Sequence, residues 1–142
     1  MGVTVRDNLT NPATFFQNAN GDWVPINHVR DYDIFGNVVR QYDGNNNATE
    51  FSYDGNSCAY ALPTTITNAL SQITTMTYDC NIGKALSSRD ANFVTTAYTY
   101  SDDLERLTQV RRADGSSAES QTNYSYPDAN HVYMYTDQTT KG

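Results

Sequence analysis

Along several short stretches of the chain, residues of one kind recur at every second position. Thr49, Phe51 and Tyr53 alternate with Ser52 and Asp54. Successive side chains of an extended strand point to opposite faces, so this alternation predicts a strand with one threonine and aromatic face. The same pattern recurs at three more places: Thr74, Met76 and Tyr78; Thr96, Tyr98 and Tyr100; Thr122, Tyr124 and Tyr126.

Turn-forming residues separate these strands. The segment 33–37 (DIFGN) offers an Asp for an Asx turn and a Gly for a positive φ. The segment 113–116 (ADGS) carries the Asp-Gly hairpin signal, and 127–130 (PDAN) has a Pro that fixes φ. Strands joined by such short turns are predicted to form antiparallel β-hairpins.

The hairpins form a repeat marked by a tyrosine and a following acid. Tyr-Asp occurs at 32, 53 and 78, and related YSD and YPD segments begin at Tyr100 and Tyr126, with spacings from 21 (53 − 32) to 26 (126 − 100) residues. A period in the twenties is typical of repeat architectures. We therefore predict an all-β fold of antiparallel β-hairpin repeats, forming a curved open sheet or a small barrel-like shell segment.

This repeat also divides the chain. We expect an N-terminal strand segment over 1–28, about four hairpin repeats over 29–128, and a C-terminal strand and tail over 129–142. Stacked hairpins would align two rows of side chains, since equivalent positions would meet on neighbouring units. One row would hold Phe51, Met76, Tyr98 and Tyr124, and the other Tyr53, Tyr78, Tyr100 and Tyr126.

Composition narrows the function classes. The 142 residues suit one domain, and 38% hydrophobic residues with a mean hydropathy of −0.64 argue against a thick aliphatic core. The net charge of −7 argues against nucleic acid as a partner, and the basic run 106–112 (RLTQVRR) is interpreted as a solvated strand face. No run of eighteen apolar residues occurs, so no membrane span is expected.

These repeats resemble the YD-repeat, or Rhs-repeat, family. The segments 32–54 (YDIFGNVVRQYDGNNNATEFSYD) and 78–102 (YDCNIGKALSSRDANFVTTAYTYSD) match its unit, and the resemblance extends over about 29–128. Glu105 replaces a glycine that the family prefers, and Pro127 interrupts the last Tyr-Asp pair. With about four units, the chain resembles a bacterial member or a fragment of one.

The resemblance implies a long β-ribbon that spirals into a hollow shell, in large secreted or surface proteins of bacteria. An extracellular or cell-surface location is therefore expected, together with a structural and interaction role. The resemblance also implies possible contact with carbohydrate. Four units leave an open sheet with two unpaired edges, so we expect self-association by edge pairing, strand exchange or end-to-end stacking.

Cys58 and Cys80 are the only cysteines. They follow Tyr53 and Tyr78 in equivalent turn regions of adjacent units, where turns on one margin of a sheet could come within disulfide reach. Export, which the resemblance implies, would favour the bond. The alternatives are two separate thiols, or a two-cysteine metal site without the usual CxxC spacing.

Aromatic side chains are the candidate carbohydrate contacts. They are Trp23, Tyr32, Tyr98 and Tyr124. Trp23 is the only tryptophan, and Pro25 marks its segment as an edge. Trp23 either plugs the open end of the sheet or offers a stacking surface for a sugar beside Tyr32.

The alternative function is a small metal-assisted hydrolase. His28 and His131 are the only histidines. If they converged with carboxylates such as Asp31, Asp33 or Asp137, they could bind a divalent transition metal such as zinc and activate water. The Tyr-Asp acids themselves are interpreted as turn caps, and neither a GxSxG elbow nor a glycine-rich phosphate loop occurs. The sequence favours the non-enzymatic module, with no cofactor.

Overall fold

The computed structural model describes residues 13–27, 29–55 and 58–138. Within them, the regular structure consists of β-strands and one short 3₁₀ turn, η1 (Cys58–Tyr60). Two sheets are present: a two-stranded sheet of β1 and β2, and a ten-stranded sheet in which β3 to β12 follow one another in chain order. The chain divides into two compact units, of which the first includes residues 13–52 and 66–71, and the second 53–65 and 72–138.

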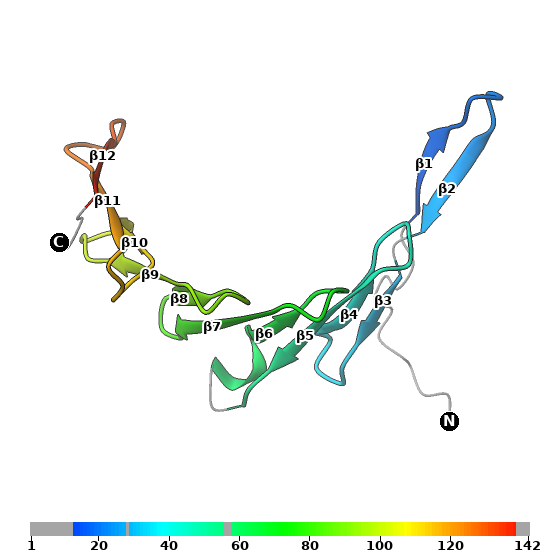
Figure 1. Cartoon of the computed structure of the whole chain (residues 1–142), viewed down its shortest axis with the longest axis horizontal. Coiled ribbons are helices and arrows are strands. Elements are labelled where there is room, and N and C mark those ends of the chain that lie inside the picture. The colour runs from blue at the N-terminus through cyan, green and yellow to red at the C-terminus, as the bar shows by residue number, and fades with distance from the viewer. Residues whose placement is uncertain (1–12, 28, 56–57, 139–142) are drawn as a thin grey trace. The chain divides into compact units, whose positions relative to one another are not determined.

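The first unit begins with the hairpin of β1 (Ala13–Gln17) and β2 (Trp23–Asn27), coloured blue in Figure 1. The strands β3 (Arg30–Tyr32), β4 (Val38–Tyr42) and most of β5 (Ala48–Tyr53) follow. Antiparallel pairing joins β3 to β4 and β4 to β5. The exposed side chains of Arg40 in β4 and Glu50 in β5 lie opposite each other, with Arg40 Nη2 and Glu50 Oε1 2.5 Å apart.

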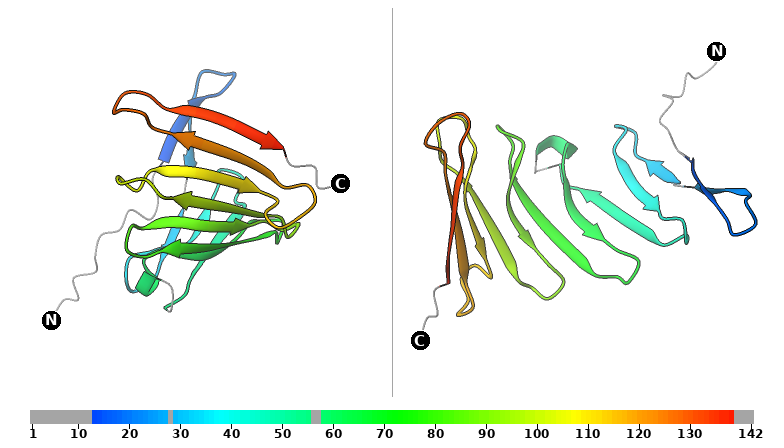
Figure 2. Two further views of the ribbon diagram at one scale, coloured as in Figure 1. Left: turned by 90° about the vertical axis from the view of Figure 1, so that its left-hand side faces the viewer. Right: turned by 90° about the horizontal axis from the view of Figure 1, so that it is seen from above.

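The second unit holds most of the repeat strands. They are β7 (Ile73–Asp79), β8 (Lys84–Arg89), β9 (Thr95–Tyr100), β10 (Leu107–Arg112), β11 (Ser120–Ser125) and β12 (Tyr133–Gln138). The strand β6 (Pro63–Thr67) begins in this unit and ends in the first. Figure 2 shows β7 to β12 side by side as consecutive antiparallel strands, coloured from green to red.

The predicted two-residue alternation is clearest in β5 and β7. In β7, Thr74, Met76 and Tyr78 are half-buried while the residues between them are exposed. In β5, Phe51 and Tyr53 are half-buried and Ser52 between them is exposed. The period-two pattern therefore identified which side chains share a face.

The turns repeat one hydrogen-bonding scheme, built on an Asp or Asn at their first position. In the β3–β4 turn, Asp33 Oδ1 accepts hydrogen bonds from the backbone N–H groups of Phe35 and Asn37, each at 2.9 Å. The turns that start at Asn18, Asp43 and Asp90 have the same pair of bonds from the second and fourth following residues. The predicted Asx turn at 33–37 is confirmed, and the scheme recurs at Asn18 and Asp90, which no tyrosine precedes.

The fourth residue of each such turn has a positive φ. Gly36 takes this position in the β3–β4 turn with φ 89°, where a residue without Cβ is favoured. Phe93 and Glu105 adopt it at 63° and 55°. Glu105 therefore occupies a position where the turn geometry favours glycine. This is the position at which the sequence departs from the glycine of the repeat pattern.

The interior of the sheet is thin. Among the described residues, Val110 and Thr122 are buried, with 5% and 3% of their surface exposed. They are directly paired across β10 and β11, and Tyr98 pairs with Val110 on the other side. This agrees with the composition, which argued against a thick aliphatic core.

The predicted straight rows of aromatic residues are wrong in register. Met76 lies opposite Ser88, and Ser88 lies opposite Thr96, so Met76 is aligned with Thr96 rather than with Tyr98. Tyr98 is aligned through Val110 with Thr122 rather than with Tyr124. Bulges in β7–β8 and β9–β10 contribute to these offsets, and the sequence repeat does not reveal them.

The fold class is confirmed as an all-β antiparallel sheet of hairpins. The strand order runs from β3 to β12, and these two strands are the edges of the described ten-stranded sheet. The sheet is therefore open, and the barrel-like alternative does not apply to the described residues. Residues 13–27 of the predicted N-terminal segment form their own hairpin sheet.

Candidate functional site

The two margins of the sheet in the second unit differ in their contacts. We call the margin where β7, β9 and β11 end the tyrosine margin, because their Tyr-Asp segments lie there. The opposite margin carries the β8–β9 and β10–β11 turns. Antiparallel order places these turns alternately on the two sides of the sheet. The tyrosine margin is the candidate functional site.

Tyrosine hydroxyls tie consecutive strands together at this margin. The Tyr78 hydroxyl donates to the backbone carbonyl of Pro63 at 2.7 Å, and the Tyr126 hydroxyl donates to that of Leu107 at 2.8 Å. Pro63 is the first residue of β6, which precedes the β7 strand of Tyr78, and Leu107 is the first residue of β10, which precedes the β11 strand that ends just before Tyr126. The repeat tyrosine thus uses its ring for packing and its hydroxyl for a bond to the preceding strand.

Burial of the tyrosine rings affects their ionisation. Desolvation raises the pKa of Tyr78 above its ordinary value, and that of Tyr100 likewise, with a smaller contribution from Tyr98. A raised pKa in the folded state means that these groups stabilise the fold below the unfolded pKa. That contribution is lost as pH rises through the folded pKa, on the alkaline side of the ordinary tyrosine value.

Basic side chains also cross from one hairpin to the next. Lys84 Nζ lies 5.1 Å from the centre of the Tyr100 ring and donates to the backbone carbonyl of Glu105. The Arg106 guanidinium lies 4.1 Å from the centre of the Tyr126 ring and pairs with Asp102 in its own turn. Such cation–π contacts favour a fixed position of the tyrosine ring.

The disulfide between Cys58 and Cys80 is present, as predicted. Their Cα atoms are 5.0 Å apart, within the ordinary range for a disulfide, and they are 22 residues apart in sequence. The bond joins η1 to the β7–β8 turn. It is a covalent link between adjacent hairpin repeats within the second unit, at the tyrosine margin.

The turn η1 has an unusual backbone. Cys58, Ala59 and Tyr60 all have positive φ, at 50°, 48° and 65°. A non-glycine residue in this conformation costs about 1–2 kcal/mol, so three in succession need support from the surrounding structure. The Tyr60 ring lies against Gly55, where an added Cβ would come within 2.5 Å of it. The sequence predicted a turn region at Cys58, but nothing in its pattern pointed to this left-handed backbone.

The acids at the ends of the tyrosine strands serve the turns. Burial raises the pKa of Asp102, but hydrogen bonds from the Arg106 backbone and side chain outweigh it, so the pKa lies below its ordinary value. For Asp33 the same balance holds, with Asn37 as the main donor. Hydrogen bonds from Asn130 and His131 lower the pKa of Asp128. These carboxylates add stability above the unfolded pKa, and the contribution is lost as pH falls through the folded pKa.

The structure gives one of the two candidate metal-binding histidines a partner. His131 Nδ1 lies 2.8 Å from both carboxylate oxygens of Asp128, on the exposed β11–β12 turn. His28 lies outside the described residues. Among residues 13–27, 29–55 and 58–138, no three or more His, Cys, Asp or Glu side chains gather as a metal site would require.

The four candidate carbohydrate contacts differ in how exposed their side chains are. Trp23 is 67% exposed in β2, whereas Tyr32 is half-buried in β3, which belongs to the other sheet. Tyr98 and Tyr124 are half-buried in β9 and β11. The Tyr98 hydroxyl lies 3.4 Å from Ser88 Oγ. Trp23 is therefore the most accessible of the four for stacking against a ligand.

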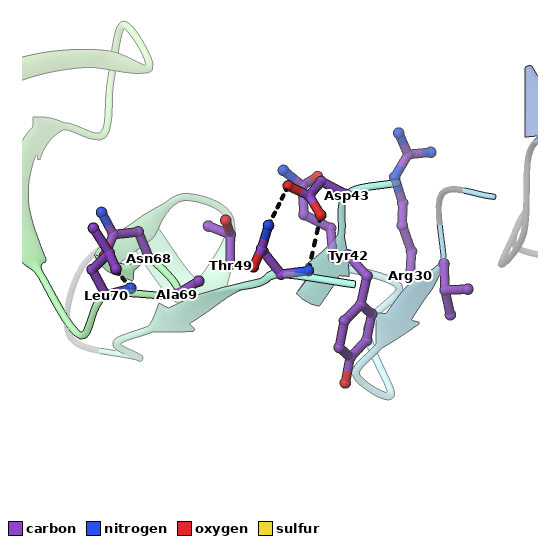
Figure 3. Close-up of a pocket in the computed structure, with 10 residues that line it drawn as sticks. Arg30, Tyr42, Asp43, Thr49, Asn68, Ala69 and Leu70 are labelled. Atoms are coloured by element: carbon purple, nitrogen blue, oxygen red, sulfur yellow. Dashed lines mark hydrogen bonds between the residues drawn. The ribbon is translucent and has the colours of Figure 1, made fainter. Parts of the chain in front are cut away.

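The first unit contains an open cavity of about 620 Å³ (Figure 3). Its lining includes Arg30, Tyr42, Asp43 and Asn68. Figure 3 shows the Arg30 and Tyr42 side chains pointing in opposite directions. Both Asp43 oxygens accept hydrogen bonds from Asn47. Asp43 therefore serves the turn, and Arg30 and Tyr42 do not converge with it on a common point.

Within the basic run 106–112, residues 107–112 form the strand β10, although Val110 there is buried rather than solvated. Arg111 and Arg112 point to opposite faces of β10, with Arg111 Nη1 3.2 Å from Asp114 and Arg112 Nη1 3.2 Å from Thr122 Oγ1. Together with Arg106, they contact three different neighbours and form no common basic surface. In the described part of the chain, no helix is long and apolar enough to cross a membrane.

Comparison with known proteins identifies the fold. No family model matches the chain, and no curated protein matches it. Among solved structures, the crystal structure of TcdB2-TccC3-Cdc42 is similar with a TM-score of 0.70 and 18% identity, covering 92% of this chain and 7% of that chain. A Tc holotoxin pore from Photorhabdus luminescens with a mutated TccC3 gives a TM-score of 0.65 and 18% identity, over 84% of this chain and 6% of that chain.

The chain thus spans a small part of the proteins whose fold it shares. Its strand arrangement resembles a segment of the Tc toxin chain, while the identity is too low to carry residue roles across. The likeness therefore supports the architecture predicted from the repeat. It leaves the role of that architecture to be argued from this chain's own contacts.

Proposed function

We propose that the chain is a wall segment of the YD-repeat type, acting as a structural and interaction module in a larger exported bacterial protein. The observation that carries this proposal is the series of side-chain ties along the tyrosine margin, where each hairpin is bound to the next. A sheet with so little buried interior needs such ties to act as one body. The likeness to a segment of the TcdB2-TccC3 chain supports the same role.

Limited proteolysis of the monomer tests the wall role. A continuous wall resists cleavage, because a protease must locally unfold a segment of its substrate before cutting it. We expect residues 58–138 to survive as one fragment when the Cys58–Cys80 bond is intact. Early cleavage at both the β8–β9 and β10–β11 turns, releasing separate hairpins, would contradict the proposal.

The disulfide supports an extracellular or cell-surface location, because such bonds persist in oxidising compartments. Intact mass measured with and without reductant, on protein from the native host, checks the bond. A reduced protein at its site of action would count against export.

The interaction role has two parts. Self-association through a free sheet edge is supported by the open strand order. Contact with carbohydrate is supported by the exposed Trp23 ring, which offers a flat apolar surface for a sugar. Retention on a glycan array should fall in Trp23→Ala and stay unchanged in Tyr98→Phe, whose half-buried ring is retained. Equal retention of wild type and Trp23→Ala would remove the carbohydrate role.

The rival hypothesis is a metal-assisted hydrolase that uses His28 and His131. The 2.8 Å contact between His131 and Asp128 is the arrangement expected of an oriented histidine, but it equally suits a turn cap. Metal content after purification separates the two hypotheses. A stoichiometric transition metal that is lost in both His28→Ala and His131→Ala would favour the enzyme.

A further inference from the structure

The Cys58–Cys80 disulfide joins two turns that differ in their own support. Cys80 lies in the β7–β8 turn, where the backbone N–H of Asn81 donates to Asp79 Oδ1 at 2.9 Å. The backbone N–H of Gly83 donates to the Asp79 carbonyl at 2.8 Å, and Gly83 takes a φ of 66° at no steric cost. This turn therefore has the contacts to keep its shape without the disulfide.

The turn η1, on the other side of the bond, has a strained backbone. Its three residues, Cys58, Ala59 and Tyr60, are all in the left-handed region, which residues with a Cβ adopt at a cost. The backbone N–H of Ala61 donates to the Cys58 carbonyl at 2.9 Å, and the Tyr60 ring lies against Gly55. The disulfide is the covalent restraint among these contacts, so η1 depends on it more than the β7–β8 turn does.

The two cysteines also differ in their access to solvent. Cys80 is exposed, whereas Cys58 is half-buried. Thiol–disulfide exchange begins when a thiolate attacks one of the two sulfurs, and access determines which one. Exposed or strained disulfides are the labile ones, whereas well-protected structural disulfides resist reduction. This disulfide combines an exposed residue at one end with a strained backbone at the other.

We propose that Cys58–Cys80 is a redox-operated latch, in which an external dithiol attacks Cys80 Sγ and reduction releases η1. In the first step the S–S bond breaks, Cys80 forms a mixed disulfide with the reductant, and Cys58 leaves as a thiolate. The second thiol of the reductant then attacks the reductant's own sulfur in that mixed disulfide and frees Cys80. Two electrons and two protons pass from the dithiol to the cysteines, and the reductant leaves as a disulfide.

The latch goes beyond the wall role, because it assigns a response to one connection in the sheet. After reduction, the residues of η1 return to the region of negative φ, and the hydrogen bond between Ala61 and Cys58 is lost. The bond from the Tyr78 hydroxyl to the Pro63 carbonyl limits the change to η1 and the residues that lead into β6. Reduction thus loosens one link between two hairpin repeats while the strands stay paired.

Amide hydrogen exchange of the full chain, with and without dithiothreitol, tests the release. The N–H of Ala61 should exchange at least about tenfold faster after reduction, while those of Gly83 and Val94 should change less than about twofold. The Cys58→Ser/Cys80→Ser variant is the control, since it should match the reduced chain whether or not the dithiol is present. Equal Ala61 rates in the oxidised and reduced chains would overturn the latch, and so would equal acceleration at all three amides.

The Ala59→Gly variant separates backbone strain from the simple loss of a cross-link. Glycine adopts the φ of 48° without a clash of its side chain, so a reduced η1 should keep more of its structure. The acceleration of Ala61 exchange on reduction should therefore fall at least about twofold. Ala91→Gly is the matched control, because it adds a glycine at an exposed turn position without a positive φ. An Ala61 response that Ala59→Gly leaves unchanged or enlarges would overturn the role assigned to the strain.

Mass spectrometry identifies the attacked sulfur. Glutathione has a single thiol, so acid quenching at early times should trap the mixed disulfide of the first step. Glutathione should be found mainly on Cys80, with Cys58 as the free thiol, because Cys80 is the exposed residue of the pair. Glutathione found mainly on Cys58 would overturn the assignment of Cys80 as the site of attack.

These outcomes separate the latch from the wall proposal. The wall is tested by the protease resistance of the oxidised chain, and the latch by the effect of reduction on Ala61 exchange. A protease-resistant chain whose Ala61 exchange ignores the dithiol would keep the wall and refute the latch. An oxidised chain that is readily cut at its turns, but whose Ala61 exchange still responds to the dithiol, would do the reverse.

Discussion

The two margins of the second unit share a turn scheme, seen at Asp90 and Asp102, but differ in what they connect. At the tyrosine margin, Tyr78, Lys84 and Arg106 each contact a neighbouring hairpin. At the opposite margin, Asp90 accepts hydrogen bonds from its own turn, and Arg89 lies 4.7 Å from the centre of the Phe93 ring in that same turn. Side chains at the tyrosine margin join neighbouring hairpins, whereas those at the opposite margin mainly stabilise their own turn.

The difference comes from side chains beyond the turn scheme. The Asp102 turn at the tyrosine margin and the Asp90 turn at the opposite margin both begin with an acid and have a positive φ near the end, at Glu105 and Phe93. At the tyrosine margin, a basic residue directly follows the positive-φ residue: Lys84 after Gly83 and Arg106 after Glu105. These long side chains reach the tyrosine of the next hairpin. The hairpins of this thin sheet are thus held together by backbone pairing and, at the tyrosine margin, by the side chain that follows the positive-φ residue of the turn.

Breaking the disulfide should give the largest effect. The Cys58→Ser/Cys80→Ser variant removes a link that closes a loop of 22 residues in sequence separation. Loop-closure entropy gives an expected loss of about 3 kcal/mol in the free energy of unfolding. Chemical denaturation measures it, and adding reductant to the variant provides the control, since it should change nothing. A loss below about 1 kcal/mol would show that the other ties suffice without the bond.

Removing single tyrosine hydroxyls should come next. Tyr78→Phe and Tyr126→Phe keep the ring but leave the carbonyls of Pro63 and Leu107 without their bonds. Each should lower the free energy of unfolding by about 1 kcal/mol. Tyr135→Phe, on an exposed ring, should change it by less than about 0.5 kcal/mol. Equal losses in the free energy of unfolding for all three variants would contradict the role of the tyrosine hydroxyls in joining hairpins at the tyrosine margin.

A matched arginine pair compares the margins directly. Arg106→Gln loses contacts with Asp102 and with the ring of Tyr126, and should cost about 0.5–1 kcal/mol. Arg89→Gln loses a stack within its own turn, and should cost less. Amide exchange should quicken in the β11–β12 turn for Arg106→Gln, and only around Phe93 for Arg89→Gln. A purely local response to Arg106→Gln would contradict the role of Arg106 between hairpins.

Relieving backbone strain should give the smallest effect, equal at both margins. Glu105 and Ala113 have φ of 55° and 53°, so Gly at either position removes a steric penalty at some cost in chain entropy. We expect Glu105→Gly and Ala113→Gly each to raise the free energy of unfolding by about 0.5 kcal/mol. Thermal denaturation measures this. A lower free energy of unfolding for Glu105→Gly alone would mean that the Glu105 side chain makes a stabilising contact at the tyrosine margin.

Part of the structure could be foreseen, because it is encoded locally. The alternation of Thr74, Met76 and Tyr78 determined a strand face, and Asp33 with Gly36 determined a turn. The disulfide was foreseen from two cysteines in equivalent turns. Each of these depends on residues whose spacing is directly visible in the repeat.

The rest depends on register, which the repeat does not encode. Bulges displaced Tyr98 from the expected row and aligned it with Thr122. The left-handed turn η1 has no sequence signal that we recognise. The contacts made by Lys84 and Arg106 do have a sequence signal, because each residue comes directly after the positive-φ residue of its turn. That signal could not be interpreted without knowing that the tyrosine of the next hairpin lies within reach.

Residue-resolved amide hydrogen exchange across the two margins tests the central claim most directly. The N–H groups of Gly83 and Arg106 report on the tyrosine margin, and those of Val94 and Ser116 on the opposite one. Ties between hairpins predict slower exchange for Gly83 and Arg106, with the difference abolished in a Tyr78→Phe/Arg106→Gln variant. Equal protection at both margins in the wild-type chain, or faster exchange at the tyrosine margin, would contradict the account.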